Sequence, residues 1–283
     1  MSQPLPHPLI GELFDSPVPP GAGWPEDPGA ADAPVARTSA DVASLAREAG
    51  SLAELESASS VCRACPRLVE WREGVAVEKR RAFAAEPYWG RPIAGWGDPT
   101  PRVLIVGLAP AAHGGNRTGR IFTGDRSGDW LYASLHRVGL AAQATSVHAG
   151  DGQALIGTRM VAAVRCAPPD NRPTIYERDT CAPWLAAELT LLLPGLRVIV
   201  ALGSYGFDAV LRTVRALGGD VPRPRPRFTH GSEAVLHSAE GAAVTLVGSF
   251  HPSQQNTFTG RLTEPMFDAV LGRAAELGGL RPA

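Results

Sequence analysis

The sequence predicts an α/β protein, built as a three-layer α/β/α sandwich around a central four-stranded parallel sheet. Three observations lead to this prediction. After Pro101, four short runs of residues are continuously apolar, as expected for strands buried on both faces. Helix-length segments separate these runs, and such alternation is typical of a parallel sheet covered by helices. The chain has 283 residues, of which 44% are hydrophobic, enough for one sizeable core.

The chain begins with a segment of different composition. Residues 1–38 are rich in Pro, Gly and Ala, which predicts a mobile or loosely attached arm. A helix is expected over residues 39–59, with apolar positions from Val42 to Leu55. A second helix is expected to run through Leu68 and Trp71. We therefore divide the chain into an arm, residues 1–38, and a single domain, residues 39–283.

Strands and helices alternate after Pro101. The expected strands are residues 102–107, 160–164, 198–202 and 244–247. The expected helices are residues 130–138, 178–193, 207–217 and 264–277. In open parallel sheets, ligands bind beyond the carboxyl ends of the strands. Polar loops follow the first, second and last of these strands, so we expect the functional site there.

Composition excludes several classes of function. The formal net charge is −1, so any nucleic-acid site must be a local patch. The apolar runs are far shorter than the roughly 20 residues that span a bilayer. The first residues lack a basic start followed by an apolar core, so a cytoplasmic protein is expected. Lys79 is the only lysine, which makes Schiff-base chemistry unexpected.

The chain has four cysteines: Cys62, Cys65, Cys166 and Cys181. The first two form a CxxC pair, and the other two are widely spaced singles. A cytoplasmic chain argues against disulfides. Four thiols that include a CxxC pair indicate a four-cysteine metal centre, either zinc or iron–sulfur. Spacing alone does not choose between these metals, and four unrelated buried cysteines are the alternative.

The loop after the first predicted strand reads GLAPAAHGGNRTGR, residues 107–120. No Lys follows a Gly, so it lacks the GxxxxGK[ST] pattern of nucleoside triphosphate sites, and it also lacks GxGxxG. In its continuation, Phe122 is suited to stack on a planar ligand, with core packing as the alternative. Asp125 is the nearest carboxylate, and a helix cap is its alternative role.

Two further loops follow the second and last predicted strands. In RCAPPDNRP, residues 165–173, three prolines rigidify the chain around Asn171. The Asn171 amide matches the O4 and N3–H edge of uracil, with an Asx turn as the alternative. In SFHPSQQNTFTGR, residues 249–261, His251 stands at the end of the strand. A purely structural histidine is the alternative there.

Together, GLAPAAHGGNRTGR, RCAPPDNRPT, HPSQQNTFTGRLTE and the four cysteines resemble the family 5 (B-type) uracil-DNA glycosylases over about residues 60–277. The resemblance implies the α/β/α sandwich and a [4Fe–4S] cluster on Cys62, Cys65, Cys166 and Cys181. It also implies monofunctional hydrolysis of the N-glycosidic bond of uracil in DNA, which initiates base excision repair. Other deaminated bases, such as hypoxanthine, are expected substrates.

The resemblance also suggests roles for individual residues. Asp125 would activate water, Asn171 would read the base or help to place the water, and His251 would donate to the uracil O2. Phe122 would stack on the base. The wall of the base pocket would be formed by Gly107, Leu108, Ala109, Ala111, Ala112 and His113. The residues expected to contact DNA are Asn116, Arg117, Ser253, Gln255, Asn256 and Arg261.

One departure shapes these expectations. Related glycosylase families carry an acid or amide inside the first motif, where this chain has Leu108, Ala109 and Ala111. The water activator is therefore sought downstream at Asp125, and a pocket without a strict side-chain reader is expected to tolerate bulkier bases. The expected protein is a monomer that acts at the nucleoid and leaves the abasic site to downstream repair enzymes.

Two rival functions remain for comparison. A zinc nucleobase deaminase requires an HxE motif, which the chain lacks. A non-catalytic nucleic-acid-binding module with a structural metal would account for the cysteines. It would not account for three polar loops placed at the ends of strands.

Overall fold

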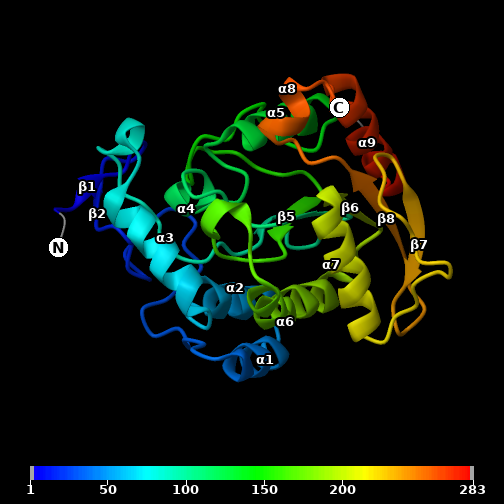
Figure 1. Cartoon of the computed structure of the whole chain (residues 1–283), viewed down its shortest axis with the longest axis horizontal. Coiled ribbons are helices and arrows are strands. Elements are labelled where there is room, and N and C mark those ends of the chain that lie inside the picture. Colours follow the sequence, from blue (N-terminus) through cyan, green and yellow to red (C-terminus); the bar gives the residue numbers. More distant parts are fainter. Residues whose placement is uncertain (1–2, 281–283) are drawn as a thin grey trace.

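A mixed six-stranded sheet forms the centre of the protein in the computed structural model, which describes residues 3–280 (Figure 1). Its strand order is β3-β5-β4-β6-β8-β7. The strands are β3 (Trp96–Gly97), β4 (Val103–Gly107), β5 (Thr158–Ala162), β6 (Val198–Leu202), β7 (Glu233–His237) and β8 (Ala243–Ser249).

The predicted four-stranded parallel sheet is confirmed as the middle of this larger sheet. Strands β5, β4, β6 and β8 pair in parallel, whereas β3 and β7 pair antiparallel at the two edges. The sequence pattern did not predict the two edge strands, and the structure shows why. Strand β3 has only two residues, and β7 has a single buried residue, so neither is a continuous apolar run.

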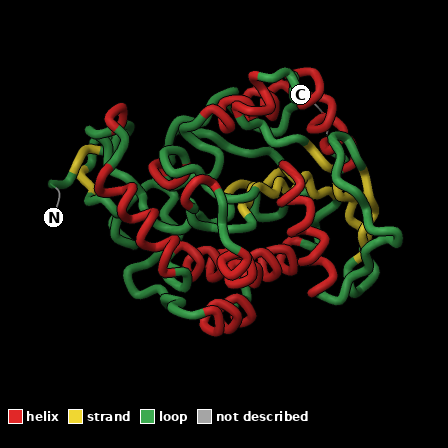
Figure 2. Tube along the Cα trace, in the orientation of Figure 1, coloured by secondary structure: helices red, strands yellow, loops and turns green. Residues whose placement is uncertain are grey.

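Helices cover both faces of the sheet, which confirms the three-layer sandwich. One face packs against α5 (Arg126–Arg137) and α9 (Glu264–Leu277), and the other against α6 (Ile175–Leu192) and α7 (Gly203–Ala216) (Figures 1 and 2). Strand residues alternate between the two cores: Val103 and Ile105 join the first, and Leu104 and Val106 join the second.

The helices begin close to the predicted positions, and polar caps explain the early starts of α5 and α6, whereas α7 begins four residues early without a side-chain cap. Helix α9 has the predicted bounds. Helix α5 begins four residues earlier than its apolar pattern indicated, because Asp125 caps it by accepting the Gly128 N–H at 2.9 Å. Helix α6 likewise begins early, behind a capping box of Thr174 and Glu177. Between residues 3 and 280, no helix combines the length and apolar character needed to cross a membrane.

The single helix expected over residues 39–59 is two helices, so that prediction is wrong. Helix α1 (Ser39–Glu48) and helix α2 (Leu52–Ser60) are separated by a break at Gly50, and Ser51 caps the second. Both pack on α6 as an additional layer. Helix α3 (Pro66–Glu78) runs through Leu68 and Trp71 as predicted. The short elements are α4 (Gly115–Thr118), α8 (Gln254–Phe258), η1 (Arg81–Phe83) and η2 (Pro169–Asn171).

The N-terminal segment packs tightly on the domain, so the prediction of a mobile or loosely attached arm is wrong. Strands β1 (Leu5–Pro6) and β2 (Leu13–Phe14) pair with each other. Phe14, Val18 and Trp24 are buried in the same core as β4 and α5. The amino-acid composition of this segment gave the wrong prediction because a few large side chains are enough to anchor a segment that is rich in Pro and Gly.

Replacing Trp24 with alanine should lower the free energy of unfolding by about 3–5 kcal/mol, because the buried indole leaves a cavity. The ring packs edge-on against Phe14 at 5.1 Å between ring centroids. Urea unfolding measures the change. The control is Ile10→Ala, since Ile10 is 45% exposed in the same segment and its loss should cost less than about 0.5 kcal/mol. Equal stability of the two variants would show that the segment is not anchored by its core side chain.

Candidate active site

The three polar loops meet at the carboxyl edge of the parallel strands, as predicted. A cavity of about 820 Å³ opens there. Its lining includes residues from all three loops: Ala111, Ala112, His113, Gly114, Asp125, Asn171 and Gln254. The cavity therefore brings together the Asp125 carboxylate, the His113 imidazole and the Asn171 amide. It lies at the edge where open α/β sheets bind ligands.

Asp125 is both a helix cap and a wall of this cavity. Its Oδ1 accepts the Gly128 N–H, while its Oδ2 faces Gly114. A Cβ at position 114 would lie 2.1 Å from Oδ2, so only glycine leaves room for this carboxylate. Burial raises the pKa of Asp125, and hydrogen bonds from the backbone of Gly128 and Ser127 oppose that shift. A carboxylate with a raised pKa is a better proton acceptor, which suits a general base.

His251 and Phe122 form an aromatic pair beside the cavity. Their ring centroids lie 5.9 Å apart, and the Phe122 ring rests on Gly107, where a Cβ would lie 2.7 Å from its Cζ. Burial lowers the pKa of His251 to about 4, so the imidazole is neutral near neutral pH and keeps one N–H donor. The side-chain amide of Asn256 donates to the His251 carbonyl at 2.8 Å and thereby fixes the backbone at this position.

The first loop faces two directions. Ala111, Ala112 and His113 line the cavity, whereas Ala109 packs against Leu68 and Cys166 on the side of the cysteines. Leu108, Phe122 and His251 lie outside the cavity lining. The predicted wall is therefore divided between a cavity surface and an adjoining aromatic surface.

Asn171 is exposed at the rim of the cavity. It and Asp170 have positive φ angles of 55° and 53°, in a tight turn behind Pro168 and Pro169. Within residues 3–280 the Asn171 side chain makes no hydrogen bond, so the Asx-turn alternative is not realised. Both ends of the amide remain free to meet a ligand or a water molecule.

Asn116 and Arg117 were expected to contact DNA; Asn116 is fully buried, which argues against this role, whereas Arg117 is largely buried but lines the cavity, so its contact with DNA stays a prediction. The Asn116 side chain is fully buried and donates to the Arg72 carbonyl at 3.1 Å. The Arg117 guanidinium is also buried, pairs with Glu86, and donates to the carbonyls of His113 and Gly124. Both side chains hold the first loop in place, a role that their polar character did not reveal.

The third loop is more accessible. Gln255 and Arg261 are exposed, Ser253 precedes the short helix α8 without a side-chain cap, and Asn256 is a partly buried residue of that helix. Their contacts with DNA stay a prediction. Sequence reasoning missed Phe258, which is 68% exposed on the same loop, with the Arg126 guanidinium over its ring. An aromatic residue within a polar loop was the available signal. It also missed Pro8 and Leu9, which bring the N-terminal segment to the cavity rim and carry no signal in the sequence.

The four cysteines line one site between the start of α3, the loop after β5, and α6. Cys65, Cys166 and Cys181 are buried, and all four thiols are unpaired with one another. Burial raises the pKa of Cys65 to about 12 and also raises the pKa of Cys62 and Cys181. Across the described chain, no group of three or more metal-binding side chains is arranged to hold a single ion.

The chemistry of this donor set fits an iron–sulfur cluster. Four cysteine thiolates are its usual ligands. Two hydrogen bonds already point at the sulfurs: Arg72 Nη1 donates to Cys166 Sγ at 2.9 Å, and the Arg165 backbone N–H donates to Cys181 Sγ at 3.3 Å. Such donors stabilise negatively charged sulfur.

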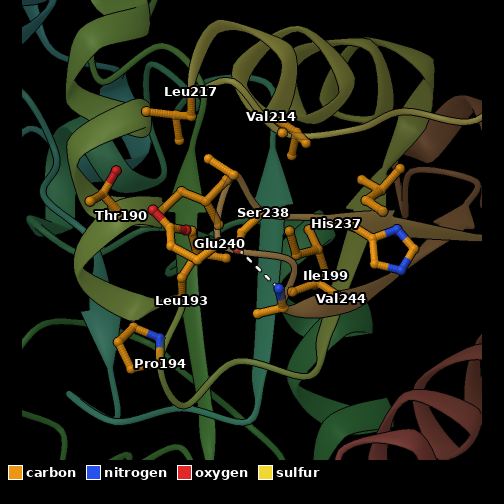
Figure 3. Close-up of a pocket in the computed structure, with 15 residues that line it drawn as sticks. Thr190, Leu193, Pro194, Ile199, Val214, Leu217, His237, Ser238, Glu240 and Val244 are labelled. Carbon is orange, nitrogen blue, oxygen red and sulfur yellow. Dashed lines mark hydrogen bonds between the residues drawn. The ribbon is translucent and has the colours of Figure 1, made fainter.

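A second cavity, of about 450 Å³, lies at the opposite end of the sheet (Figure 3). It opens between α6, α7 and the turn from β7 to β8, near the amino ends of β6 and β8. Its lining is mostly aliphatic, as with Leu193, Val214 and Leu217, and His237 and Glu240 are its only titratable residues. It therefore lacks the group of polar side chains found at the carboxyl edge.

Comparison with known proteins shows which family the chain resembles. Residues 94–274 match the family model described as "Uracil DNA glycosylase superfamily". A "Type-5 uracil-DNA glycosylase" of Mycobacterium tuberculosis (strain CDC 1551 / Oshkosh) is 57% identical over 274 residues, which cover 97% of this chain and 99% of that protein. Proteins with the same name from Thermus thermophilus and Pyrobaculum aerophilum are 49% and 44% identical, over 78% and 77% of this chain and 95% and 89% of theirs.

Proposed function

The chain belongs to the uracil-DNA glycosylase superfamily and is a uracil-DNA glycosylase, a hydrolase of DNA repair, and from this premise we propose how it removes the base. The enzyme is monofunctional: water replaces the base, and the strand is left uncut with an abasic site. The observation that carries this proposal is the buried Asp125 carboxylate in the wall of the cavity at the carboxyl edge of the sheet, the same edge at which the neutral imidazole of His251 follows β8.

The target nucleotide must leave the base stack before its glycosidic bond can be reached. We place the flipped uracil against the ring of Phe122, with the small residues Ala111 and Ala112 leaving space for it. The exposed amide of Asn171 meets the polar edge of the base or the attacking water. The DNA backbone runs over the exposed third loop, where Gln255 and Arg261 are available to phosphates.

Breaking the glycosidic bond puts positive charge on the sugar and negative charge on the departing base. Fixed donors and charges that stabilise this separation are usually the largest catalytic contribution. The neutral His251 donates its N–H to the uracil O2 as that oxygen becomes negative. The Asp125 carboxylate accepts a proton from the attacking water and stabilises the positive sugar. Lys79, the only lysine of the sequence, follows helix α3 and does not line the cavity, so no lysine amine competes with water.

The same geometry supports a broad choice of base. The positions of the first loop that face the cavity carry methyl groups rather than a polar reader. Asn171 is held at the rim by backbone alone, so its amide can adjust to a different ring edge. We therefore propose that hypoxanthine and other deaminated bases are also removed.

We propose that Cys62, Cys65, Cys166 and Cys181 hold a [4Fe–4S] cluster. When bound, the cluster supplies a cross-link between α3, the loop that carries Asn171, and α6. Base removal is a hydrolysis and needs no electrons, so each chemical step is assigned to the side chains of the cavity. Purified protein that is colourless and carries zinc on the thiols would contradict the cluster.

The enzyme needs only one chain, because one chain supplies the whole cavity, so the proposed working form is a monomer. Its place of action is the chromosomal DNA in the cytoplasm. The abasic product is then a substrate for enzymes that cut the strand and fill the gap.

A gel assay with end-labelled duplexes tests the proposal. On a duplex that contains one uracil, the strand should break only after alkali treatment, because the abasic site is alkali-labile. An inosine duplex should behave in the same way, and a matched thymine duplex should stay intact. Strand cleavage without alkali would contradict a monofunctional enzyme. A mobility shift with no alkali-labile product would instead support a non-catalytic binding module.

A further inference from the structure

We propose that Arg72 is a positioning residue for the iron–sulfur cluster, and that it joins the cysteine site to the loops of the uracil cavity. The guanidinium provides the counter-charge for the cluster through Cys166, and the backbone carbonyl of Arg72 anchors the first loop. The inference rests on the proposed cluster, and it adds a role for a residue that is neither a ligand nor part of the cavity.

The first support is the burial of an arginine without a close acid. Arg72 lies on α3 with 1% of its surface exposed. Its nearest carboxylate oxygen, from Glu73, is 3.8 Å away, and that carboxylate already pairs with Arg63. Among residues 3–280, the other buried arginines each have a carboxylate oxygen within 2.7 Å: Arg91, Arg117, Arg120, Arg159 and Arg165.

A buried charge without a close partner is costly. We therefore expect another source of negative charge near the Arg72 guanidinium. The Arg72 guanidinium donates to Cys166 Sγ at 2.9 Å and to the Cys62 carbonyl at 3.1 Å. Neutral thiols would leave the guanidinium with only the Glu73 carboxylate, which is 3.8 Å away and is shared with Arg63. A cluster on four thiolates brings negative charge to this position, and the hydrogen bond to sulfur is of the kind that tunes cluster potentials.

The second support is the position of Arg72 between the two sites. Its carbonyl accepts the buried Asn116 side chain at 3.1 Å, and Asn116 belongs to the loop that lines the uracil cavity. Its guanidinium holds Cys166, which starts the loop that carries Asn171. One residue therefore contacts both loops through different groups. This arrangement also explains why Asn116 is buried rather than exposed to DNA.

The test compares Arg72→Gln and Arg72→Lys with Arg63→Gln in the full-length holoprotein without DNA. Arg63 lies between two of the cysteines, but its side chain is 41% exposed and bound to Glu73. The midpoint potential of the cluster is measured by a redox titration followed by electron paramagnetic resonance. Loss of the cluster to a chelator is followed by visible absorption.

Arg72→Gln should shift the midpoint potential to more negative values, because a positive charge and a hydrogen bond to sulfur are lost. The cluster should be lost on the order of tenfold faster. Arg72→Lys keeps the charge and should shift the potential less, with cluster loss still faster than in Arg63→Gln. Arg63→Gln should match the wild type. If Arg72→Gln does not fold, the Arg72→Lys variant provides the test. Loss of the cluster from Arg72→Lys at the same rate as from Arg63→Gln would then overturn the proposal.

These readouts separate this inference from the proposed function. A coloured protein whose potential shifts in Arg72→Gln but which does not excise uracil would contradict the proposed chemistry of the cavity alone. A protein that excises uracil while the potential of Arg72→Gln equals that of the wild type would contradict the role of Arg72 alone.

Discussion

Replacing His251 with alanine should reduce the single-turnover rate of uracil excision by about 100- to 1,000-fold, the usual cost of removing one donor to a developing oxyanion. The reason is the geometry after β8, where the neutral imidazole of His251 lies 5.9 Å from the Phe122 ring, measured between ring centroids. We propose that the flipped base stacks on this Phe122 ring. Rates are measured with enzyme in excess over a uracil duplex, so that product release does not obscure the chemical step.

The control is His237→Ala, because His237 lies in the aliphatic cavity at the opposite end of the sheet. Its rate should equal that of the wild type. The low pKa of His251, about 4, gives a second check. Because burial keeps the imidazole neutral above about pH 4, titration of His251 should leave the wild-type rate unchanged above that pH. An unchanged rate in His251→Ala would exclude it as the donor.

Replacing Asp125 with asparagine should reduce the same single-turnover rate by about 100- to 10,000-fold, the range for loss of a general base. Asparagine is chosen because it caps helices as well as aspartate does, so the hydrogen bond from Gly128 can be kept. The substitution therefore removes the proton acceptor while it preserves the start of α5. Urea unfolding of the variant should show a stability close to that of the wild type.

The pH dependence gives an independent check on Asp125. Burial raises its pKa, and the ionised form is the base, so the wild-type rate should fall as the pH drops through this raised pKa. The Asp125→Asn rate should not show that step. Asp208→Asn serves as the control, since this exposed carboxylate pairs with Arg225 on the surface. If Asp125→Asn keeps both the wild-type rate and the wild-type pH profile, another group activates the water.

The centre of the fold could be predicted because its signal is local. Continuous apolar runs specify strands that are buried on both faces, and four such runs gave the parallel core. The edge strands, the break at Gly50 and the packed N-terminal segment depend on pairing and on single large side chains. Trp24 illustrates this, because one indole anchors a segment whose composition suggests disorder.

The candidate site was predictable to the level of loops rather than of side chains. Parallel strands place their carboxyl ends together, so Asp125 and Asn171 were expected to meet at one edge, and both line the cavity. Asn116 shows what the sequence could not reveal. Its direction depends on the Arg72 carbonyl of a distant helix, and a polar residue in a glycine-rich loop looks the same whether it faces DNA or the interior.

The central claim is that Asp125 and His251 act on one transition state at the carboxyl edge of the sheet. The double variant Asp125→Asn/His251→Ala tests it most directly, measured beside both single variants for release of free uracil under single-turnover conditions. The account predicts that the double variant is folded, that it releases almost no uracil, and that its loss is smaller than the product of the two single losses, as for residues that act as a unit. Release of uracil by the folded double variant at the wild-type rate would contradict it.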